Sequence, residues 1–308
     1  MTPRLLDCSA SDFIAMDKPA LLHAIRSAEG RTLLCETASL MEPLIPGITN
    51  AEVAASLGAD LLLLNFFDVE RPAVRGIPDG TAPDEVIARL KQLTGRPIGI
   101  NLEPVDEKYA PAEGDPYHVP SGRVATPANA RRAAELGVDI IVLTGNPGAG
   151  VSNETIADAL RTISDEVGDR VILAAGRMHA AGVFGAPEAG LLDEGDVDAF
   201  VEAGADIVLL PVPGTVPGVT PELVRRLIAR AHAGRVLAMT TIGTSQEGAD
   251  EATIRQFALA AKIAGADLHH IGDACYSGIA SPENVQAYSI AIRGRRHTLA
   301  RMARSIQR

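Results

Sequence analysis

One short pattern occurs four times along the chain. A glycine, an alanine or valine, an aspartate and an apolar run follow one another in LGADLLLLNFF from Leu57, LGVDIIVLTGN from Leu136, AGADIVLLPVP from Ala203 and AGADLHHIGDA from Ala264. Each copy closes an amphipathic helical stretch. The glycine is typical of a helix C-cap, and the short apolar run is typical of a strand buried on both faces. The repeat therefore predicts four junctions from a helix into a buried strand.

A second pattern alternates strictly with the first. It joins a glycine and an arginine to another apolar run in GRTLLCETA from Gly30, GRPIGINLEP from Gly95, GDRVILAAGRMH from Gly168 and GRVLAMTTIGT from Gly234. Together the two patterns predict eight strand–helix units and a parallel sheet. A closed (β/α)8 TIM barrel fits this length best, with an open doubly wound sheet as the alternative. The strands are expected to begin near Leu33, Leu61, Ile98, Ile140, Ile172, Ile207, Leu237 and Leu268.

The chain is expected to form a single TIM-barrel domain over residues 1–308. Residues 1–30 form a helical extension that closes the barrel's bottom, and residues 31–308 form the barrel. The net charge of −11 and the 3% aromatic content argue against a nucleic-acid or anionic-membrane partner. No run of 18 apolar residues and no signal-like segment occurs, so we expect a cytoplasmic protein. The basic end RGRRHTLARMARSIQR is either a contact in a homo-oligomer or a solvated face.

Alternation along the strands predicts a site at the mouth of the barrel. When residues are counted from each Arg or Asp, the even positions are apolar and should face the helices. The odd positions become polar toward the strand ends, which is what an active site at the carboxyl ends of barrel strands requires. These odd, inward-facing residues are Glu36, Asn65, Asn101, Glu103, Thr144, Asn146, Arg177, His179, Thr240, Thr244 and His270. The even residues His269 and Cys35 should face the helices.

The inward-facing residues suggest acid–base chemistry. Glu36, Glu103 and His270 are the candidate catalytic residues, because neighbouring carboxylates in a desolvated mouth have separated pKa values. Glu103 with His179 and Asp273 could instead bind a divalent metal, Mg or Mn more readily than Zn. The alternative for each glutamate is a salt bridge to Arg177 that only fills the barrel.

Arg177 is expected to hold an anionic group of the substrate, because it is the only inward-facing cation on a predicted strand. Loops after the seventh and eighth strands, IGTSQEG and GDACYSGIASPEN, suggest a phosphate site. The predicted substrate-binding set is Asn65, Asn101, Thr144, Arg177, Thr240, Thr244, Gly272 and Gly278. No dinucleotide or Walker A motif is present, and no lysine ends a strand, so neither NAD nor PLP is expected.

The long segment Pro104–Asn129 is interpreted either as a lid at the mouth, with Tyr109, Tyr117 and His118 as its contributors, or as a solvated excursion. Cys275 follows the eighth strand and is interpreted as a packed thiol rather than a nucleophile.

The segments PGITNAEVAASLGADLLLLNFFDV, GINLEPV, VLTGNPGAGVSN and HHIGDACYSGIASPENV resemble a bacterial TIM-barrel family of unassigned function. Members carry labels such as haloacid dehalogenase-like or phosphonomutase-like. The resemblance covers the whole chain and implies a TIM barrel but no established reaction. The chain lacks the DxDx(T/V) motif of haloacid dehalogenases and the lysine–cysteine motif of phosphonomutases.

The sequence thus favours an enzyme that acts on a small anionic, phosphorylated metabolite by a lyase or isomerase step, with or without a divalent metal. One alternative is a glycoside hydrolase that uses the two glutamates. The other is a non-catalytic metabolite-binding protein, which a closed network of salt bridges inside the barrel would support.

Overall fold

The computed structural model describes residues 3–106, 108–109, 118–179 and 191–308. Eight parallel strands form a closed barrel in chain order, so the predicted TIM barrel is confirmed. The strands are β1 Thr32–Ala38, β2 Leu61–Asn65, β3 Ile98–Leu102, β4 Ile140–Leu143, β5 Ile172–Gly176, β6 Ile207–Pro211, β7 Leu237–Ile242 and β8 Leu268–Ile271. Seven of them begin at the predicted residue, and β1 begins one residue earlier.

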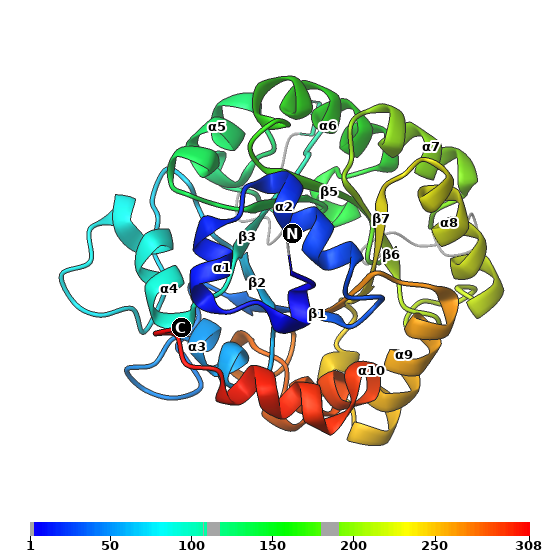
Figure 1. Ribbon diagram of the computed structural model, residues 1–308. Helices are drawn as coiled ribbons and strands as arrows, with labels where there is room; N and C mark the ends of the chain where they lie inside the picture. Colours follow the sequence, from blue (N-terminus) through cyan, green and yellow to red (C-terminus); the bar gives the residue numbers. More distant parts are fainter. Residues whose placement is uncertain (1–2, 107, 110–117, 180–190) are drawn as a thin grey trace.

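Helices surround the barrel (Figure 1). They are α3 Asn50–Ser56, α4 Val86–Thr94, α5 Pro127–Glu135, α6 Asn153–Val167, α7 Glu194–Glu202, α8 Pro221–Ala233, α9 Glu251–Ala264 and α10 Pro282–Ala303. Apolar side chains on the outward faces of the strands pack against them in one continuous core. Among the described helices, none has both the length and the hydrophobicity that crossing a bilayer requires.

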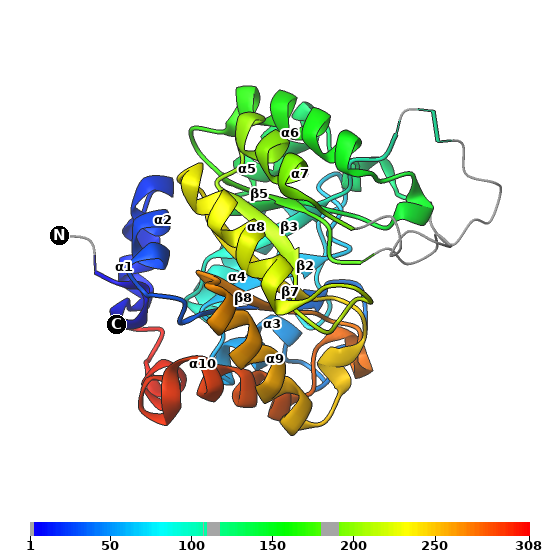
Figure 2. The ribbon, with the colours of Figure 1, turned by 90° about the vertical axis from the view of Figure 1, so that its right-hand side faces the viewer.

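The N-terminal segment covers one end of the barrel, as expected, but as more than one helix (Figures 1 and 2). A 3-10 turn, Leu5–Asp7, precedes α1 Ala10–Ala15 and α2 Lys18–Arg26. The second helix starts anew because Asp17 caps it, accepting a hydrogen bond of 2.9 Å from the Ala20 N–H. The apolar side chains of this segment share one core cluster with the residues inside the barrel, so it closes the end opposite the carboxyl ends of the strands.

The four aspartates of the first repeat play one structural part. Each lies just before an even-numbered strand, and its carboxylate accepts the backbone N–H of a residue on the preceding odd-numbered strand. The pairs are Asp60 with Leu33 (2.9 Å), Asp139 with Ile98 (2.8 Å), Asp206 with Leu173 (2.8 Å) and Asp267 with Ala238 (2.8 Å). The same type of hydrogen bond therefore fixes the register between the two strands of each of the four pairs.

The positions of these hydrogen bonds show that the side chains of β5 and β7 face the opposite way from the prediction. Leu33 is the second residue after its arginine, whereas Leu173 and Ala238 are the third after theirs. One extra residue reverses every side chain of a strand. Four residues predicted to face the helices therefore lie in the cluster that fills the barrel, and these are Ile172, Ala174, Leu237 and Met239.

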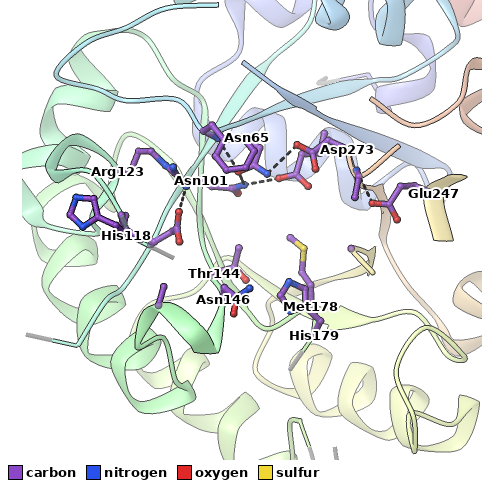
Figure 3. Close-up of a pocket in the computed structure, with 18 residues that line it drawn as sticks. Asn65, Asn101, His118, Arg123, Thr144, Asn146, Met178, His179, Glu247 and Asp273 are labelled. Atoms are coloured by element: carbon purple, nitrogen blue, oxygen red, sulfur yellow. Dashed lines mark hydrogen bonds and ion pairs between the residues drawn. The ribbon is translucent and has the colours of Figure 1, made fainter. Parts of the chain in front are cut away.

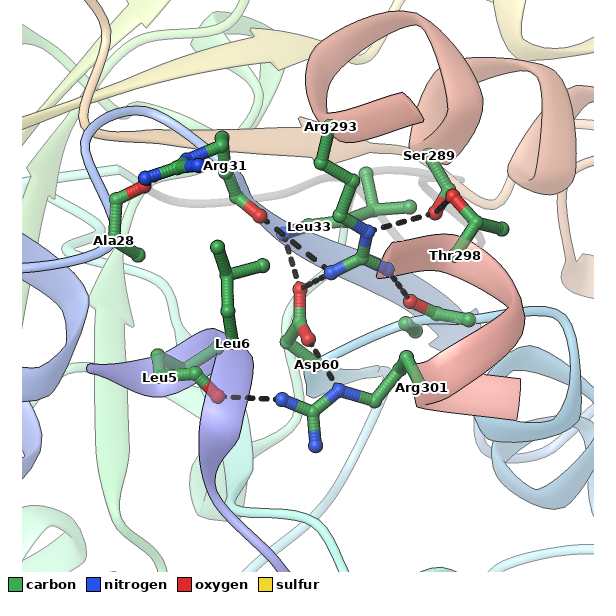
Figure 4. Close-up of polar contacts among 12 residues, drawn as sticks. Leu5, Leu6, Ala28, Arg31, Leu33, Asp60, Ser289, Arg293, Thr298 and Arg301 are labelled. Atoms are coloured by element: carbon green, nitrogen blue, oxygen red, sulfur yellow. Dashed lines mark hydrogen bonds and ion pairs between the residues drawn. The ribbon is translucent and has the colours of Figure 1, made fainter. Parts of the chain in front are cut away.

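Each repeat aspartate also has a basic side chain as its partner, and Asp60 has the most deeply buried ones. Arg293 Nη1 lies 2.5 Å from one Asp60 oxygen, and Arg301 Nε lies 2.7 Å from the other (Figure 4). Arg301 also donates to the Leu5 and Cys8 carbonyls, so the cluster joins the barrel, the N-terminal segment and α10. The other three partners, which are partly exposed, are Lys91 for Asp139, Lys18 for Asp206 and His232 for Asp267.

Candidate functional site

A cavity of about 370 Å³ opens at the carboxyl ends of the strands (Figure 3). This is the end at which TIM barrels carry their active sites. Its lining includes eight residues that were predicted to lie inside the barrel or to bind a metal: Glu36, Asn65, Asn101, Glu103, Thr144, Asn146, His179 and Asp273. Residues that it did not name as candidates also line the cavity, and chief among them are Phe66, Arg123, Met178 and Glu247.

Glu36 stands at the floor of the cavity and is held by two side chains. Asn101 Nδ2 donates to one carboxylate oxygen at 2.6 Å, and His270 Nε2 lies 3.1 Å from the other. His270 is fully buried and is not part of the cavity lining. It therefore supports Glu36 from the barrel interior, one layer below the mouth, as the alternation of β8 predicted.

Asp273 follows β8 and brings a second carboxylate to the floor. Its Oδ2 accepts a hydrogen bond of 3.1 Å from Asn65 Nδ2. Burial, and next the negative charge of Glu36, raise the pKa of Asp273 to about 8. At neutral pH this carboxyl group therefore retains a proton, and a protonated carboxyl group can act as an acid.

Glu247 is a third carboxylate at the floor and was missed in the sequence. It lies in the 3-10 turn Gln246–Gly248 after β7, where strand alternation no longer predicts direction. The Ala274 N–H donates to its Oε1 at 3.0 Å, and burial raises its pKa. A Cβ at Gly272 would lie 2.7 Å from this oxygen, so glycine is required there for Glu247 to approach.

Glu103 does not pair with Arg177, the partner that the sequence suggested. It forms an ion pair with Arg123 of the long loop, on the opposite side of the cavity from Glu247 (Figure 3). Arg123 also lies over the Phe66 ring, with its guanidinium carbon 4.7 Å from the ring centroid. Burial raises the pKa of Glu103, and the charge of Arg123 opposes that shift. The pair fixes both side chains at the cavity wall.

The loop that carries Arg123 is anchored rather than loose at this end. The Glu103 N–H donates to the Arg123 carbonyl, and the Ala125 N–H donates to the Glu103 carbonyl, both at 2.8 Å. His118 and Val119 of the same loop line the cavity. Tyr109 is not in the lining, and Tyr117 lies outside the described residues.

Gly122 holds the Arg123 turn against its neighbours, which gives a testable prediction. A Cβ there would lie 1.9 Å from Asp68 Oδ1 and 2.9 Å from the Glu70 nitrogen. We expect Gly122→Ala to displace the turn and to lower the free energy of unfolding by about 1–3 kcal/mol, the usual cost of overpacking. Urea unfolding measures this. Gly195→Ala, whose Cβ would meet only Asp193 Oδ1 at 3.1 Å, is the control. Equal, small losses in both variants would contradict the prediction.

Five of the predicted substrate-binding residues do not line the cavity: Arg177, Thr240, Thr244, Gly272 and Gly278. Because β5 and β7 each have one extra residue after the arginine, the side chains of Arg177, Thr240 and Thr244 point away from the cavity. Thr240 faces outward, 3.5 Å from His269 Nδ1, and Thr244 donates to the Thr215 carbonyl at 3.4 Å. Met178, not Arg177, turns toward the cavity.

The two glycines serve packing instead. Gly272 makes room for Glu247, as described above. Gly278 adopts a positive φ of 69°, and a Cβ there would lie 2.6 Å from the Ala38 Cβ. Neither glycine contributes to the lining of the cavity.

The predictions for His269 and Cys35 are confirmed. His269 Nε2 lies 3.1 Å from the Gly30 carbonyl oxygen, and Nδ1 lies 3.3 Å from the Tyr288 hydroxyl of α10. Burial lowers the pKa of His269 to about 4, so this imidazole is neutral and structural. Cys35 lies in the outer core cluster, beneath the helices.

The expected metal ligands do not assemble into a site. Within the described part of the chain, no three His, Cys, Asp or Glu side chains come together in a way that could hold one metal ion. Glu103 is paired with Arg123 across the cavity from Asp273 (Figure 3). Burial lowers the pKa of His179, and the charge of Arg177 lowers it further.

Comparison with known structures agrees with the barrel. A structure of an archaeal fructose-1,6-bisphosphate aldolase bound to a carbinolamine intermediate has 15% identity and a TM-score of 0.56, covering 90% of this chain and 99% of that one. Another archaeal fructose 1,6-bisphosphate aldolase has 16% identity and a TM-score of 0.55, covering 89% and 98%. 2,3-Dimethylmalate lyase, of the PEP mutase/isocitrate lyase superfamily, has 13% identity and a TM-score of 0.48, covering 86% and 81%. At these identities the likeness shows the fold alone.

Comparison by sequence places the chain in a family. No curated protein gives a significant match. A family model described as "Domain of unknown function (DUF7916)" matches residues 6–308. The label haloacid dehalogenase-like is not supported by this match. Because the match spans nearly the whole chain, the protein belongs to the DUF7916 family.

Proposed function

We propose that this protein is an enzyme that catalyses a lyase or isomerase step on a small anionic metabolite. The observation that carries the proposal is the pair of carboxyl groups at the cavity floor. Asp273, with its pKa raised to about 8, holds a proton at neutral pH, while Glu36 is held between Asn101 Nδ2 and His270 Nε2. A protonated carboxyl group beside a second, fixed carboxyl group allows one site to supply both an acid and a base.

In the proposed step, Glu36 removes a proton from a substrate carbon and Asp273 donates its proton to an oxygen or nitrogen of the substrate. An isomerase then returns the proton to a neighbouring carbon. A lyase releases the protonated leaving group instead. His270 and Asn101 hold the Glu36 carboxylate in place during transfer. After a lyase step, in which the bond from carbon to the leaving group breaks as the double bond forms, Glu36 gives its proton to water and Asp273 takes one from water. In an isomerase, Glu36 has already returned its proton to carbon, and Asp273 takes its proton back from the substrate oxygen or nitrogen.

Arg123 takes the anion-binding part that the sequence analysis gave to Arg177. It is the only Arg or Lys in the described lining of the cavity. Within the described chain, its ion pair with Glu103 uses one guanidinium nitrogen, and the other N–H groups have no hydrogen-bond partner. A planar guanidinium with free donors suits a carboxylate. Thr244 and Gly278, from the loops after β7 and β8 that were predicted to bind phosphate, do not line the cavity. We therefore propose that the anionic group of the substrate is a carboxylate rather than a phosphate.

The two alternative functions have less support. A glycoside hydrolase would need Glu36 and Glu103 as its acid and base. Glu103 is instead held in an ion pair with Arg123. A non-catalytic binding protein would be favoured by a closed network of salt bridges inside the barrel. Within the described part of the chain, the floor instead keeps hydrogen-bond acceptors without donors, at Asn101 Oδ1 and Glu247 Oε2.

Solvent deuterium exchange tests the proposal. The protein is incubated in D₂O with a panel of small oxo, hydroxy and amino carboxylic acids, and ¹H NMR follows loss of carbon-bound protons and appearance of products. We expect protein-dependent exchange, elimination or isomerisation with at least one acid. The rate should fall as the pH rises above about 8, because Asp273 then loses its proton. The absence of any reaction across the panel, from a folded protein, would contradict the proposal.

A further inference from the structure

Two hydrogen-bond acceptors at the cavity floor have no donor among the residues that the structure describes. They are Asn101 Oδ1 and Glu247 Oε2, and both residues line the cavity. Asn101 is only 9% exposed and Glu247 1%. The orientation of the Asn101 amide is set by Glu36, since a carboxylate accepts only from the NH₂ group. Buried acceptors without donors are costly, so the floor is built to receive a group that donates.

Charge is distributed unevenly across the same cavity. The carboxyl groups of Asp273 and Glu247 lie at one side, and Arg123 lies at the other (Figure 3). Glu36 lines the same cavity. The charges of these carboxyl groups interact, since Glu36 raises the pKa of both Asp273 and Glu247. A group that binds at this floor gains most if it carries positive charge, because it then relieves the mutual repulsion of the carboxylates.

We propose that the floor formed by Glu36, Asn101, Asp273 and Glu247 binds a primary ammonium group, so that the substrate is a small zwitterionic amino acid whose carboxylate rests on Arg123. The inference rests on the proposed function and names its substrate class. An ammonium group supplies three donors and a positive charge. A hydroxyl group supplies one donor and no charge, and it would leave the carboxylates uncompensated. In the described chain, the side chains at this floor do not assemble into a metal site.

Isothermal calorimetry on matched acids tests the proposal. The probes are 3-aminopropionate, 3-hydroxypropionate and propionate, and the corresponding four-carbon and five-carbon series. We expect the amino acid of the best-fitting length to bind at least about 10-fold more tightly than its hydroxy and unsubstituted partners, as one buried hydrogen-bond set allows.

Two variants assign the ends of the ligand. Glu247→Gln keeps the shape of the floor but replaces a charged acceptor, so it should remove the preference for the amine without weakening the unsubstituted acid. The double variant Arg123→Met/Glu103→Gln removes both members of the wall pair, so no buried charge is left alone. It should weaken all carboxylates by the same factor. Thermal unfolding confirms that each variant is folded. Asp273→Asn, which also removes a carboxyl group from the floor and should likewise weaken the preference for the amine, replaces Glu247→Gln if that variant does not fold.

Several outcomes would overturn the inference. These are equal affinities for the amino and hydroxy acids, no binding of any probe at millimolar concentration, or tight binding of Mg²⁺ or Mn²⁺ alone that Glu247→Gln removes. The proposed function can be judged separately. Deuterium exchange on an acid without an amine would retain the function and refute the ammonium site, whereas amine-specific binding without any turnover would do the reverse.

Discussion

Asp273→Asn is expected to reduce turnover by about 10²–10⁴, the range for loss of a general acid or base. The amide preserves the shape of the side chain and cannot donate a carboxyl proton. The loss should appear in the exchange assay at every pH below about 8, where the wild-type group is protonated. Near-normal turnover in a folded Asp273→Asn protein would remove this residue from the mechanism.

The same substitution should increase stability at high pH. The pKa of Asp273 is raised in the folded state from an ordinary value of 3.8 to about 8. The folded protein therefore binds this proton more tightly than the unfolded chain does. The group's contribution to stability is fully present below about pH 4 and is lost as the pH rises to about 8. At about 1.4 kcal/mol per pKa unit, the loss is on the order of several kcal/mol.

Urea unfolding across pH 4 to 9 measures this effect. Asp273→Asn should match the wild type near pH 4 and exceed its stability at pH 8 and above. Asp79→Asn makes the same chemical change on an exposed loop and should leave the pH profile unaltered. A wild-type profile that rises toward pH 8, or a variant that is less stable there, would show that Asp273 is not a protonated acid.

Asp60→Asn is expected to lower the free energy of unfolding by about 3–5 kcal/mol, the cost of removing one member of a buried ion pair. Asp60 is the negative charge between Arg293 and Arg301, and the side chains of all three are at most 1% exposed (Figure 4). Arg96 lies nearby, where burial and the charge of Arg301 lower its pKa to about 10. Without Asp60, three buried guanidinium groups would repel one another.

The repeat supplies a matched control for this experiment. Asp139 occupies the equivalent place and accepts the backbone N–H of Ile98, but its partner Lys91 is 29% exposed. Asp139→Asn should therefore cost about 1 kcal/mol or less, as exposed pairs do. Chemical denaturation of both variants gives the comparison. Equal losses would show that the backbone hydrogen bond, rather than the buried charge, accounts for the effect.

Much of the fold could be predicted because its signals are local. The glycine at each helix end and the apolar run after it act over a few residues, and they located all eight strands. Burial on both faces made the closed barrel the best arrangement. Alternation then placed Glu36, Asn65, Asn101 and Glu103 at the mouth, because β1, β2 and β3 carry no extra residue. His270 was placed below Glu36 for the same reason.

The rest depended on contacts between distant parts of the chain. The direction of the side chains on β5 and β7 is set by hydrogen bonds that Asp206 and Asp267 accept from those strands. Counting residues along one strand does not reveal this register. Arg177 was misplaced for this reason.

The sequence by itself determined the barrel and the carboxylates that its first three strands carry inward, because periodicity is a property of the chain. Only the tertiary structure decided which groups complete the cavity. Arg123 and Glu247 reach it from loops, where no period exists and the path is set by packing against Asp68, Gly272 and their neighbours. The charge on Asp273 was decided in the same way, since its raised pKa requires the burial and the nearby Glu36 that only folding provides.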